Sequence, residues 1–217
     1  MFVGHYSASF IAKAVAPTVP LWLLLVAAQL LDIAWGILIL SGVEHATLDA
    51  TLPSSPLVLQ HIPYTHSLVA AVVWSLIAFA IANKAMHFTA RESIVVALVV
   101  ASHWFLDLIV HRPDLPLLNG PTKLGLGLWN FPMIAYGLEM FLLAISVWLS
   151  VRIIPIRNDR RRVWYIFGGA LLIVQTIGSF SAIPTTITAV ALSMLALYAI
   201  IPVAGRWVER RQRRANY

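Results

Sequence analysis

The chain contains no cysteine, which excludes disulfide bonds and thiolate metal sites. Charged residues are scarce as well, at 11% of 217 residues, whereas soluble domains average about 25%. Apolar residues instead make up 60% of the chain. A soluble protein of this size could not hide so much apolar surface in its core. The composition therefore excludes an ordinary soluble domain and predicts a protein whose outer surface faces lipid.

The N-terminus lacks the pattern of a cleaved signal peptide, because no basic segment precedes the first apolar stretch. About 20 apolar residues are needed to cross a hydrocarbon core of about 30 Å. Stretches of roughly this length predict six spans: residues 21–42, 66–82, 93–110, 131–151, 163–179 and 184–204. The predicted fold class is all-α, a polytopic membrane protein forming one integral membrane domain, residues 1–217. Residues 1–151 hold the polar candidates described below, and residues 152–217 form a two-helix scaffold with a basic tail.

Arginine is concentrated in two segments, and their positions predict the orientation in the membrane. Each segment carries five arginines: Arg152, Arg157, Arg160, Arg161 and Arg162 after the fourth span, and Arg206, Arg210, Arg211, Arg213 and Arg214 after the sixth. The positive-inside rule places both segments, and hence both termini, in the cytoplasm. Residues 43–65 contain no Lys or Arg and fall outside, whereas Arg112 and Lys123 depart from the rule. The net charge of +6 is interpreted as a membrane anchor and not as a nucleic-acid-binding surface.

Residues 2–16 are apolar but too short to cross the bilayer. One interpretation is an amphipathic helix on the cytoplasmic surface. The other is a half-helix that lies in the membrane and joins the first span through a turn at residues 17–20. At 1.5 Å per residue, His5 would then lie about 17 Å from the turn and Asp32 about 18 Å from it, at similar depth. The sequence leaves both alternatives open.

Three carboxylates fall inside predicted spans, namely Asp32, Asp107 and Glu139. A charged side chain at the centre of a bilayer costs about 2.5–3.5 kcal/mol, so the three cost on the order of 8–10 kcal/mol if ionised and unpaired. No nearby Lys or Arg within the spans is available to pair with them. Protonation, hydrogen bonds to histidine or a bound cation must therefore offset this cost.

The third span places three ionisable residues four positions apart: His103, Asp107 and His111. This spacing stacks them on one face of a helix. A histidine and an aspartate one turn apart can both reach a single Zn²⁺. Alternatively, Asp107 accepts a hydrogen bond from His103 and fixes its tautomer. The pattern indicates a functional site in either case.

The other spans add fewer polar residues. His66 begins the second span near the outer surface, where it can approach the outer end of the third, and His61 lies in the loop before it. Asp32 shares a helical face with Gly36, and glycine allows a neighbouring helix to come close. Glu139 is interpreted either as a proton-handling group or as a structural carboxylate with satisfied hydrogen bonds.

The motifs Gly4-His5, Leu31-Asp32-Ile33, Thr65-His66-Ser67 and Ser102-His103 with Asp107 occur in this order. Together they resemble the YdjM-like family of inner-membrane-associated, metal-dependent hydrolases described as LexA-regulated. The family pattern contains Gly-His, Pro-Asp-Ile-Asp, His-Arg-Gly-x-Thr-His-Ser and Ser-His-x-x-x-Asp. The resemblance covers about the first 120 of 217 residues. It implies a multi-pass protein of a bacterial-type inner (plasma) membrane.

The chain departs from this pattern at two places. Ala34 replaces the second Asp of the Asp-Ile-Asp motif, which argues against a two-metal site. Ile62-Pro63 replaces the Arg-Gly of the histidine motif, which removes an anion contact. Arg112, beside His111, offers a substitute at the outer mouth because a guanidinium group recognises phosphate well.

The resemblance and the residues together predict a metal-dependent hydrolase of an ester or phosphoester, lipid substrates included. The expected ligands of one divalent metal, zinc in the first instance, are His5, Asp32, His66, His103 and Asp107. A spare carboxylate, Asp32 or Glu139, is the expected general base. Substrate contacts are expected at His61, His111 and Arg112. The expected partners are membrane lipid and a small-molecule or lipid substrate, with no nucleic acid.

Two other functions use the same cluster of His and Asp residues. An ion- or proton-coupled transporter would bind an ion transiently or relay protons through it. An accessory membrane protein would hold a purely structural metal. Six spans without a detectable inverted repeat are not typical of a carrier, which favours the hydrolase.

Overall fold

The computed structural model describes residues 1–182 and 184–213, so the end of the predicted basic tail, from Arg214 on, lies outside the described residues. Within the described part, five helices are long and apolar enough to cross a membrane: Leu68–Ala85, Ala90–Val110, Pro132–Ile153, Asn158–Phe180 and Ile187–Arg210. A bent pair, Leu21–Ala28 and Leu30–Leu40, passes the same test and raises the number of spans to six. The predicted all-α, polytopic fold is confirmed.

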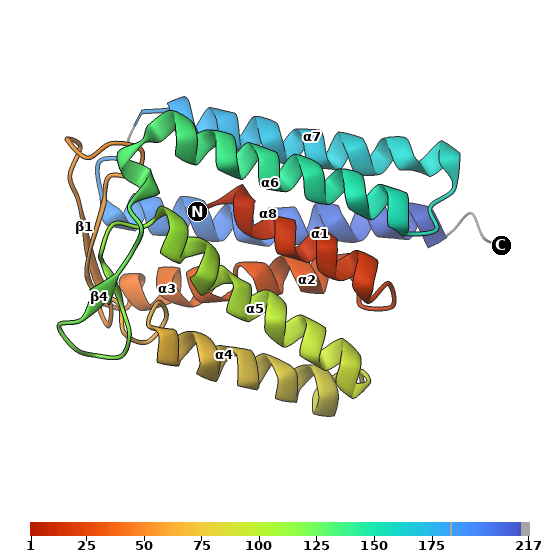
Figure 1. The fold of residues 1–217 in the computed structure, drawn as a ribbon, viewed down its shortest axis with the longest axis horizontal. Helices are drawn as coiled ribbons and strands as arrows, with labels where there is room; N and C mark the ends of the chain where they lie inside the picture. The colour runs from red at the N-terminus through yellow and green to blue at the C-terminus, as the bar shows by residue number, and fades with distance from the viewer. Residues whose placement is uncertain (183, 214–217) are drawn as a thin grey trace.

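The helices pack side by side along the long axis of the molecule (Figure 1). In chain order they are α2 (Leu21–Ala28), α3 (Leu30–Leu40), α4 (Leu68–Ala80) with a π-helical turn η2 (Ile81–Ala85), α5 (Ala90–Val110), α6 (Pro132–Ile153), α7 (Asn158–Phe180) and α8 (Ile187–Arg213). Local signals fix several of their starts. The Ser67 hydroxyl accepts a hydrogen bond from the Ala70 amide at the start of α4, and Thr89 with Glu92 forms a capping box at the start of α5.

Two short hairpins that the sequence did not predict lie at the end of the bundle opposite the C-terminus (Figure 1). The strand β1 (His45–Leu48) pairs antiparallel with β2 (Leu57–His61). The strand β3 (Leu115–Pro116) pairs antiparallel with β4 (Lys123–Leu124), just before the 3₁₀ turn η3 (Leu128–Asn130). Both hairpins connect helices over the end of the bundle where the site described below lies.

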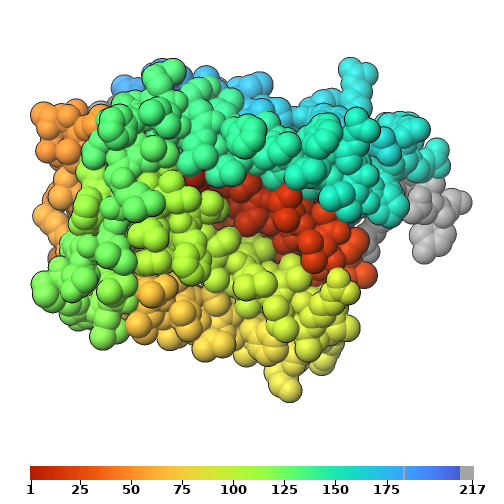
Figure 2. Space-filling view, viewed as in Figure 1, coloured from red at the N-terminus to blue at the C-terminus, as the bar shows by residue number. Residues whose placement is uncertain are grey.

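The first residues lie inside the bundle and not on a membrane surface. They form the 3₁₀ turn η1 (Val3–His5) and the helix α1 (Tyr6–Val15). Val3, Tyr6 and Phe10 are completely buried. The space-filling view shows α1 in a recess between α5 and α6 (Figure 2). The half-helix interpretation is therefore confirmed, and the surface-helix interpretation is wrong because the apolar face of α1 packs against protein.

A buried ion pair ties the turn of this half-helix to the last helix. The Nζ atom of Lys13 lies 2.6 Å from Oε1 of Glu209 on α8, and it also donates to the carbonyl oxygens of Pro17 and Val19. The other carboxylate oxygen of Glu209 accepts a hydrogen bond of 3.0 Å from the Leu21 amide, which is one of the unpaired donors at the start of α2. Two residues 196 positions apart thus hold the turn between α1 and α2 against α8.

The opposite end of the half-helix is held by side chains of other helices. The Oε2 atom of Glu139, on α6, accepts hydrogen bonds from the amides of Phe2 and Gly4 at 2.8 and 3.2 Å. Gln29 donates to the Phe2 carbonyl at 3.0 Å. A Cβ atom on Gly4 would lie 2.8 Å from Met1 Sδ and 3.1 Å from Glu139 Cγ, so any other residue would displace these two side chains. These contacts fix the position of the neighbouring His5.

The loop after β4 packs against the end of α5 through Gly125. A Cβ atom at this position would collide with the backbone carbonyls of His111 and Arg112. Gly125→Ala should therefore destabilise the protein by about 1–3 kcal/mol, because backbone and not a flexible side chain must move. Thermal unfolding in detergent micelles measures this effect. Gly120→Ala is the matched control, since nothing lies within 4 Å of its Cβ, and an equal loss in both variants would contradict the prediction.

Candidate metal centre

The five residues predicted as metal ligands meet in the interior of the bundle. They come from four segments: η1, α3, the segment just before α4, and α5. The residues are His5, Asp32, His66, His103 and Asp107, and none of them is more than 7% exposed. They form two groups whose ligand atoms lie within 4.8 Å of one another, His5 with His103 and Asp107, and Asp32 with His66 and His103. His103 belongs to both groups and is the centre of the arrangement.

One group is built on a single turn of α5. The Nε2 atom of His103 lies 3.1 Å from Oδ2 of Asp107, as their spacing of four residues predicted. The half-helix brings His5 to the same place, with its Nε2 atom 3.2 Å from Oδ1 of Asp107. The rings of His5 and His103 are stacked at 3.7 Å between centroids, with 6° between their planes. The stacking directs both imidazoles toward the same carboxylate.

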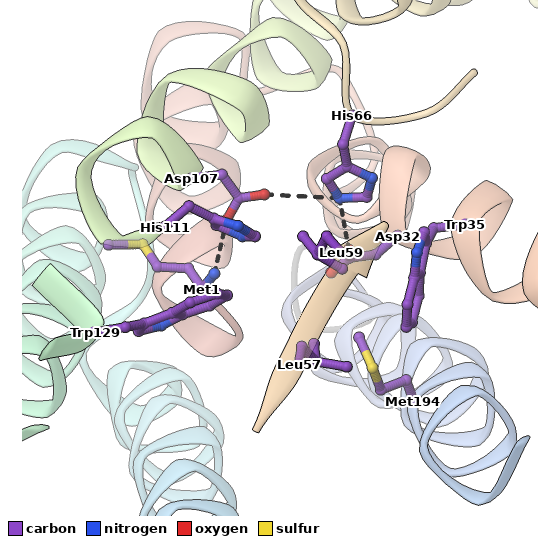
Figure 3. A pocket seen from close by; sticks show the side chains of 10 residues that line it. All are labelled: Met1, Asp32, Trp35, Leu57, Leu59, His66, Asp107, His111, Trp129 and Met194. Carbon is purple, nitrogen blue, oxygen red and sulfur yellow. Dashed lines mark hydrogen bonds and ion pairs between the residues drawn. The ribbon is translucent and has the colours of Figure 1, made fainter. Parts of the chain in front are cut away.

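The second group shares the Nε2 atom of His103 with the first. His66 is placed between the two aspartates, with Nε2 3.2 Å from Oδ1 of Asp32 and 3.7 Å from Oδ2 of Asp107 (Figure 3). Nε2 of His103 is 3.6 Å from the same oxygen of Asp32. Both carboxylates therefore face both imidazoles, and the two groups form one continuous cluster.

The first span is broken at Gln29, where the sequence predicted one straight helix. The helices α2 and α3 meet there at an angle of 54°. The carbonyl oxygen of Ala28, next to the break, accepts a hydrogen bond of 2.7 Å from Nδ1 of His103. Because Nδ1 carries the proton in this bond, the lone pair of Nε2 is directed into the cluster. The break thus fixes the orientation of the central histidine.

The last helix also contributes to the site, although the sequence indicated only a scaffold. The hydroxyl of Tyr198, on α8, donates a hydrogen bond of 2.7 Å to Oδ2 of Asp32. The close approach of α8 is possible because Gly36 has no side chain, and a Cβ there would lie 3.0 Å from Leu195. A tyrosine in an apolar span carries no clear signal of function, so sequence reasoning missed it.

Several nitrogen atoms in the cluster have no hydrogen-bond partner among the described residues. These atoms are Nδ1 and Nε2 of His5 and Nε2 of His103. A buried polar atom without a partner is costly, and imidazole nitrogens beside carboxylates are the usual donor set for zinc and similar divalent ions. The residues present therefore fit a metal ion, and the cluster can hold one.

His111 lies at the edge of the cluster. Its Nε2 atom is 3.5 Å from Oδ1 of Asp107, and its Nδ1 atom is 2.9 Å from Oδ1 of Asp114. The ring packs on Trp129 with centroids 4.0 Å apart. Burial lowers the pKa of His111, but the two carboxylates outweigh burial and raise its pKa above the usual value. The residue faces the same space as the cluster, as the predicted substrate contact should.

Arg112 is predicted to contact the substrate, but its donors are directed at neighbouring loops. They contact the carbonyl oxygens of Pro53 and Ser55 and the side chain of Asn130, at 2.6, 3.2 and 3.2 Å. The guanidinium group thus holds the loop between β1 and β2 against the end of α5. Its role as an anion contact stays a prediction.

His61 and Glu139 lie outside the two groups of possible metal ligands. His61 is at the end of β2, where its ring contacts those of His45 and Tyr64. Glu139 binds the first backbone amides of the half-helix, which corresponds to the structural alternative for this carboxylate. A general-base role for Glu139 stays a prediction, as does a substrate contact for His61.

A small cavity opens beside the cluster, with a volume of about 50 Å³. Asp107, His66, His111 and the amino group of Met1 form its polar side, and the amino group lies 2.7 Å from Oδ1 of Asp107 (Figure 3). The apolar side is lined by Trp35, Leu57, Leu59 and Met194. The space is sufficient for a few water-sized groups next to the carboxylates.

A larger cavity of about 300 Å³ adjoins the first. The two share part of their lining, namely Met1, Leu57, Trp129 and Met194. The larger one continues to Ser179 on α7 and Leu197 on α8. A molecule much larger than water can therefore lie next to the cluster.

The buried His and Asp residues and the apolar helices thus describe a membrane protein with a possible metal site. Which membrane it occupies, and which end of the bundle faces the cytoplasm, stays a prediction. The same holds for the resemblance to the YdjM-like family. No family model, no curated protein and no solved structure matches the chain.

Proposed function

We propose that the protein is a membrane-embedded, metal-dependent hydrolase of an ester or phosphoester bond. One observation carries the proposal: two buried carboxylates and three imidazoles face one another inside the bundle. Both carboxylates lie within 3.7 Å of Nε2 of His66, and a cation held among these groups would offset the cost of burying two negative charges. The order of the sequence motifs shared with the YdjM-like family supports the same function.

In this proposal His5, His66, His103 and Asp107 hold one divalent ion, with zinc as the predicted metal. A single ion is favoured because His103 takes part in both ligand groups but has only one free nitrogen. A bound ion of this type supplies Lewis acidity, which polarises the scissile bond and makes a water molecule more acidic. The protein contributes a dry, preorganised site whose ligands are already oriented.

Asp32 is the proposed general base. It lines the small cavity, and Tyr198 holds its Oδ2 atom by a hydrogen bond of 2.7 Å. Its Oδ1 atom faces the cluster, 3.2 Å from Nε2 of His66. A carboxylate fixed in this way can orient a water molecule in the cavity and accept its proton. His111, on the same side, is placed to contact the substrate.

The two adjoining cavities support an ester or phosphoester that carries an apolar group. The small cavity accommodates the reacting group, and the larger one accommodates the rest of the molecule between α7 and α8. We further propose that the arginine-rich segments face the cytoplasm of a bacterial-type inner membrane. The cluster then lies toward the outer leaflet, from which a lipid or a small molecule can enter.

The Asp32→Asn variant tests the assignment of roles. The variant should retain the metal but lose at least about 100-fold in kcat, because the amide cannot accept a proton. Hydrolysis is measured in nanodiscs with a chromogenic carboxylic ester, a phosphomonoester and a phosphodiester, each in a short-chain and a long-chain form. Metal content is measured in parallel by mass spectrometry. Asp49→Asn, in the exposed loop after β1, is the matched control.

The outcomes separate the functions. Loss of the metal together with activity in Asp32→Asn would make Asp32 a ligand and contradict its role as a base. If the metal-loaded protein hydrolyses none of the six compounds, the hydrolase proposal is wrong. Weak, exchangeable metal binding together with ion flux in liposomes would instead indicate the transporter.

A further inference from the structure

His66 is the only proposed ligand that lies between secondary-structure elements, because α4 begins two residues later at Leu68. A residue in such a segment needs other contacts to keep its ring in one orientation. Those contacts come from Thr65 and from Glu44, which precedes β1. Both are almost completely inaccessible to solvent, at 0% and 1% exposure.

The hydrogen bonds in this group determine which atom donates to which. The Thr65 hydroxyl lies 2.6 Å from Oε2 of Glu44 and 2.8 Å from Nδ1 of His66. A hydroxyl group has one proton, and a carboxylate can only accept it. Thr65 therefore donates to Glu44 and accepts from the N–H at Nδ1 of His66. Nδ1 therefore keeps its proton, and Nε2, which lies 3.2 Å from Oδ1 of Asp32 and 3.7 Å from Oδ2 of Asp107, is the nitrogen that a metal can bind by displacing the proton it shares with Asp32.

Once that proton is displaced, the lone pair of Nε2 is directed at two carboxylates, which is unfavourable unless a positive charge lies between them. The tautomer that Glu44 imposes through Thr65 is thus the one a metal ligand requires. The other oxygen of Glu44 accepts from the amides of Tyr64 and Thr65, at 2.8 and 3.0 Å. One oxygen of Glu44 therefore holds the backbone of Tyr64 and Thr65, and the other orients the His66 imidazole through the Thr65 hydroxyl.

We propose that Glu44 is a positioning residue that acts through the Thr65 hydroxyl to fix the ring and the tautomer of His66 for metal binding. The inference rests on the proposed metal site and adds a residue that no motif of the sequence indicated. Carboxylates that orient a histidine ligand typically contribute 10–100-fold to metal affinity.

The pair Thr65→Val and Thr65→Ser tests the inference, because the two variants differ in the hydroxyl. Co²⁺ is the probe, and its affinity and visible absorption spectrum are measured in detergent-solubilised full-length protein. Thr65→Val should bind Co²⁺ about 10–100-fold more weakly, with a changed spectrum, since the imidazole loses its acceptor. The Co²⁺ affinity of Thr65→Ser should remain within about threefold of the wild-type value, because serine keeps the hydroxyl that links Glu44 to His66. A merely structural role for Thr65 would leave the Co²⁺ spectrum of the folded Thr65→Val protein unchanged.

Glu44→Gln provides a second, metal-independent measurement. Its amide can donate to Thr65, so the hydroxyl would then donate to Nδ1 of His66 and leave the ring proton on Nε2. ¹⁵N NMR of histidine-labelled, metal-free protein should show Nδ1 of His66 protonated in the wild type and unprotonated in the variant. The same tautomer in both proteins would overturn the inference.

The failure of this inference can be distinguished from that of the proposed function. Wild-type affinity and spectrum in Thr65→Val would overturn the role of Glu44 and leave the hydrolase standing. Wild-type protein that binds no Co²⁺ would overturn both. Co²⁺ binding that depends on the Thr65 hydroxyl, in a protein without hydrolytic activity, would support the inference and remove the hydrolase.

Discussion

His103→Ala should remove the metal from the purified protein. The wild type is expected to carry one equivalent per chain, and the variant less than about a tenth of it. His103 contributes to both groups of ligand atoms, so its loss leaves two potential ligands in each. The loss of metal affinity should exceed the 10–100-fold that a change outside the ligands causes, since neither group keeps three ligand atoms. Elemental mass spectrometry after purification without chelators measures the content.

The control for this experiment is His45→Ala. His45 is exposed on β1, so the variant should keep the full metal content. Two equivalents in the wild type would contradict a single ion, and unchanged content in His103→Ala would exclude His103 as a ligand. A metal-free wild type would favour a proton-handling role for the cluster, because the carboxylates would then be neutralised by protons.

Lys13→Met should destabilise the protein by about 3–5 kcal/mol, the usual result of leaving one partner of a buried ion pair alone. The side chains of Lys13 and Glu209 are only 3% and 8% exposed. Removing the lysine takes away the ammonium group that lies 2.6 Å from Oε1 of Glu209, while the Leu21 amide still donates to the other oxygen. The half-helix should then detach from α8, which also displaces His5. Unfolding in mixed micelles and Co²⁺ affinity measure the two effects.

A double-mutant cycle with Glu209→Gln isolates the pair. The double variant should be more stable than the sum of the single losses predicts, because neither charge remains unpaired. The control is Asp159→Asn, whose partner Arg157 is exposed, and its loss should stay below about 1 kcal/mol. Additive single losses at Lys13 and Glu209 would mean that the two charges do not stabilise each other.

The spans and the ligand candidates could be predicted because each depends on local sequence. Long apolar stretches identify membrane helices, and a spacing of four residues places His103 and Asp107 on one face. Carboxylates in an apolar span stand out because lipid makes them costly. The helical rise of 1.5 Å per residue on either side of the turn placed His5 and Asp32 at similar depth, which agrees with their meeting in one cluster.

The remaining features depend on contacts between distant segments. The break between α2 and α3 at Gln29 contains no proline, so the sequence did not predict it. It is accompanied by hydrogen bonds from Gln29 to Phe2 and from His103 to Ala28. Tyr198 joins the site across 166 positions. Glu44 lies in a loop, where carboxylates are common, so its sequence position gives no indication of a functional role. No periodicity or motif reveals such partners before the chain is folded.

The half-helix has a consequence for the biogenesis of the protein. His5 is synthesised before the side chains that hold its segment, which come later, on α6 and finally on α8. Because synthesis proceeds from the N-terminus, the half-helix has its full set of contacts only after Glu209 has been inserted and paired with Lys13. For the proposed metal site, stable metal binding is therefore expected only after α8 has been inserted.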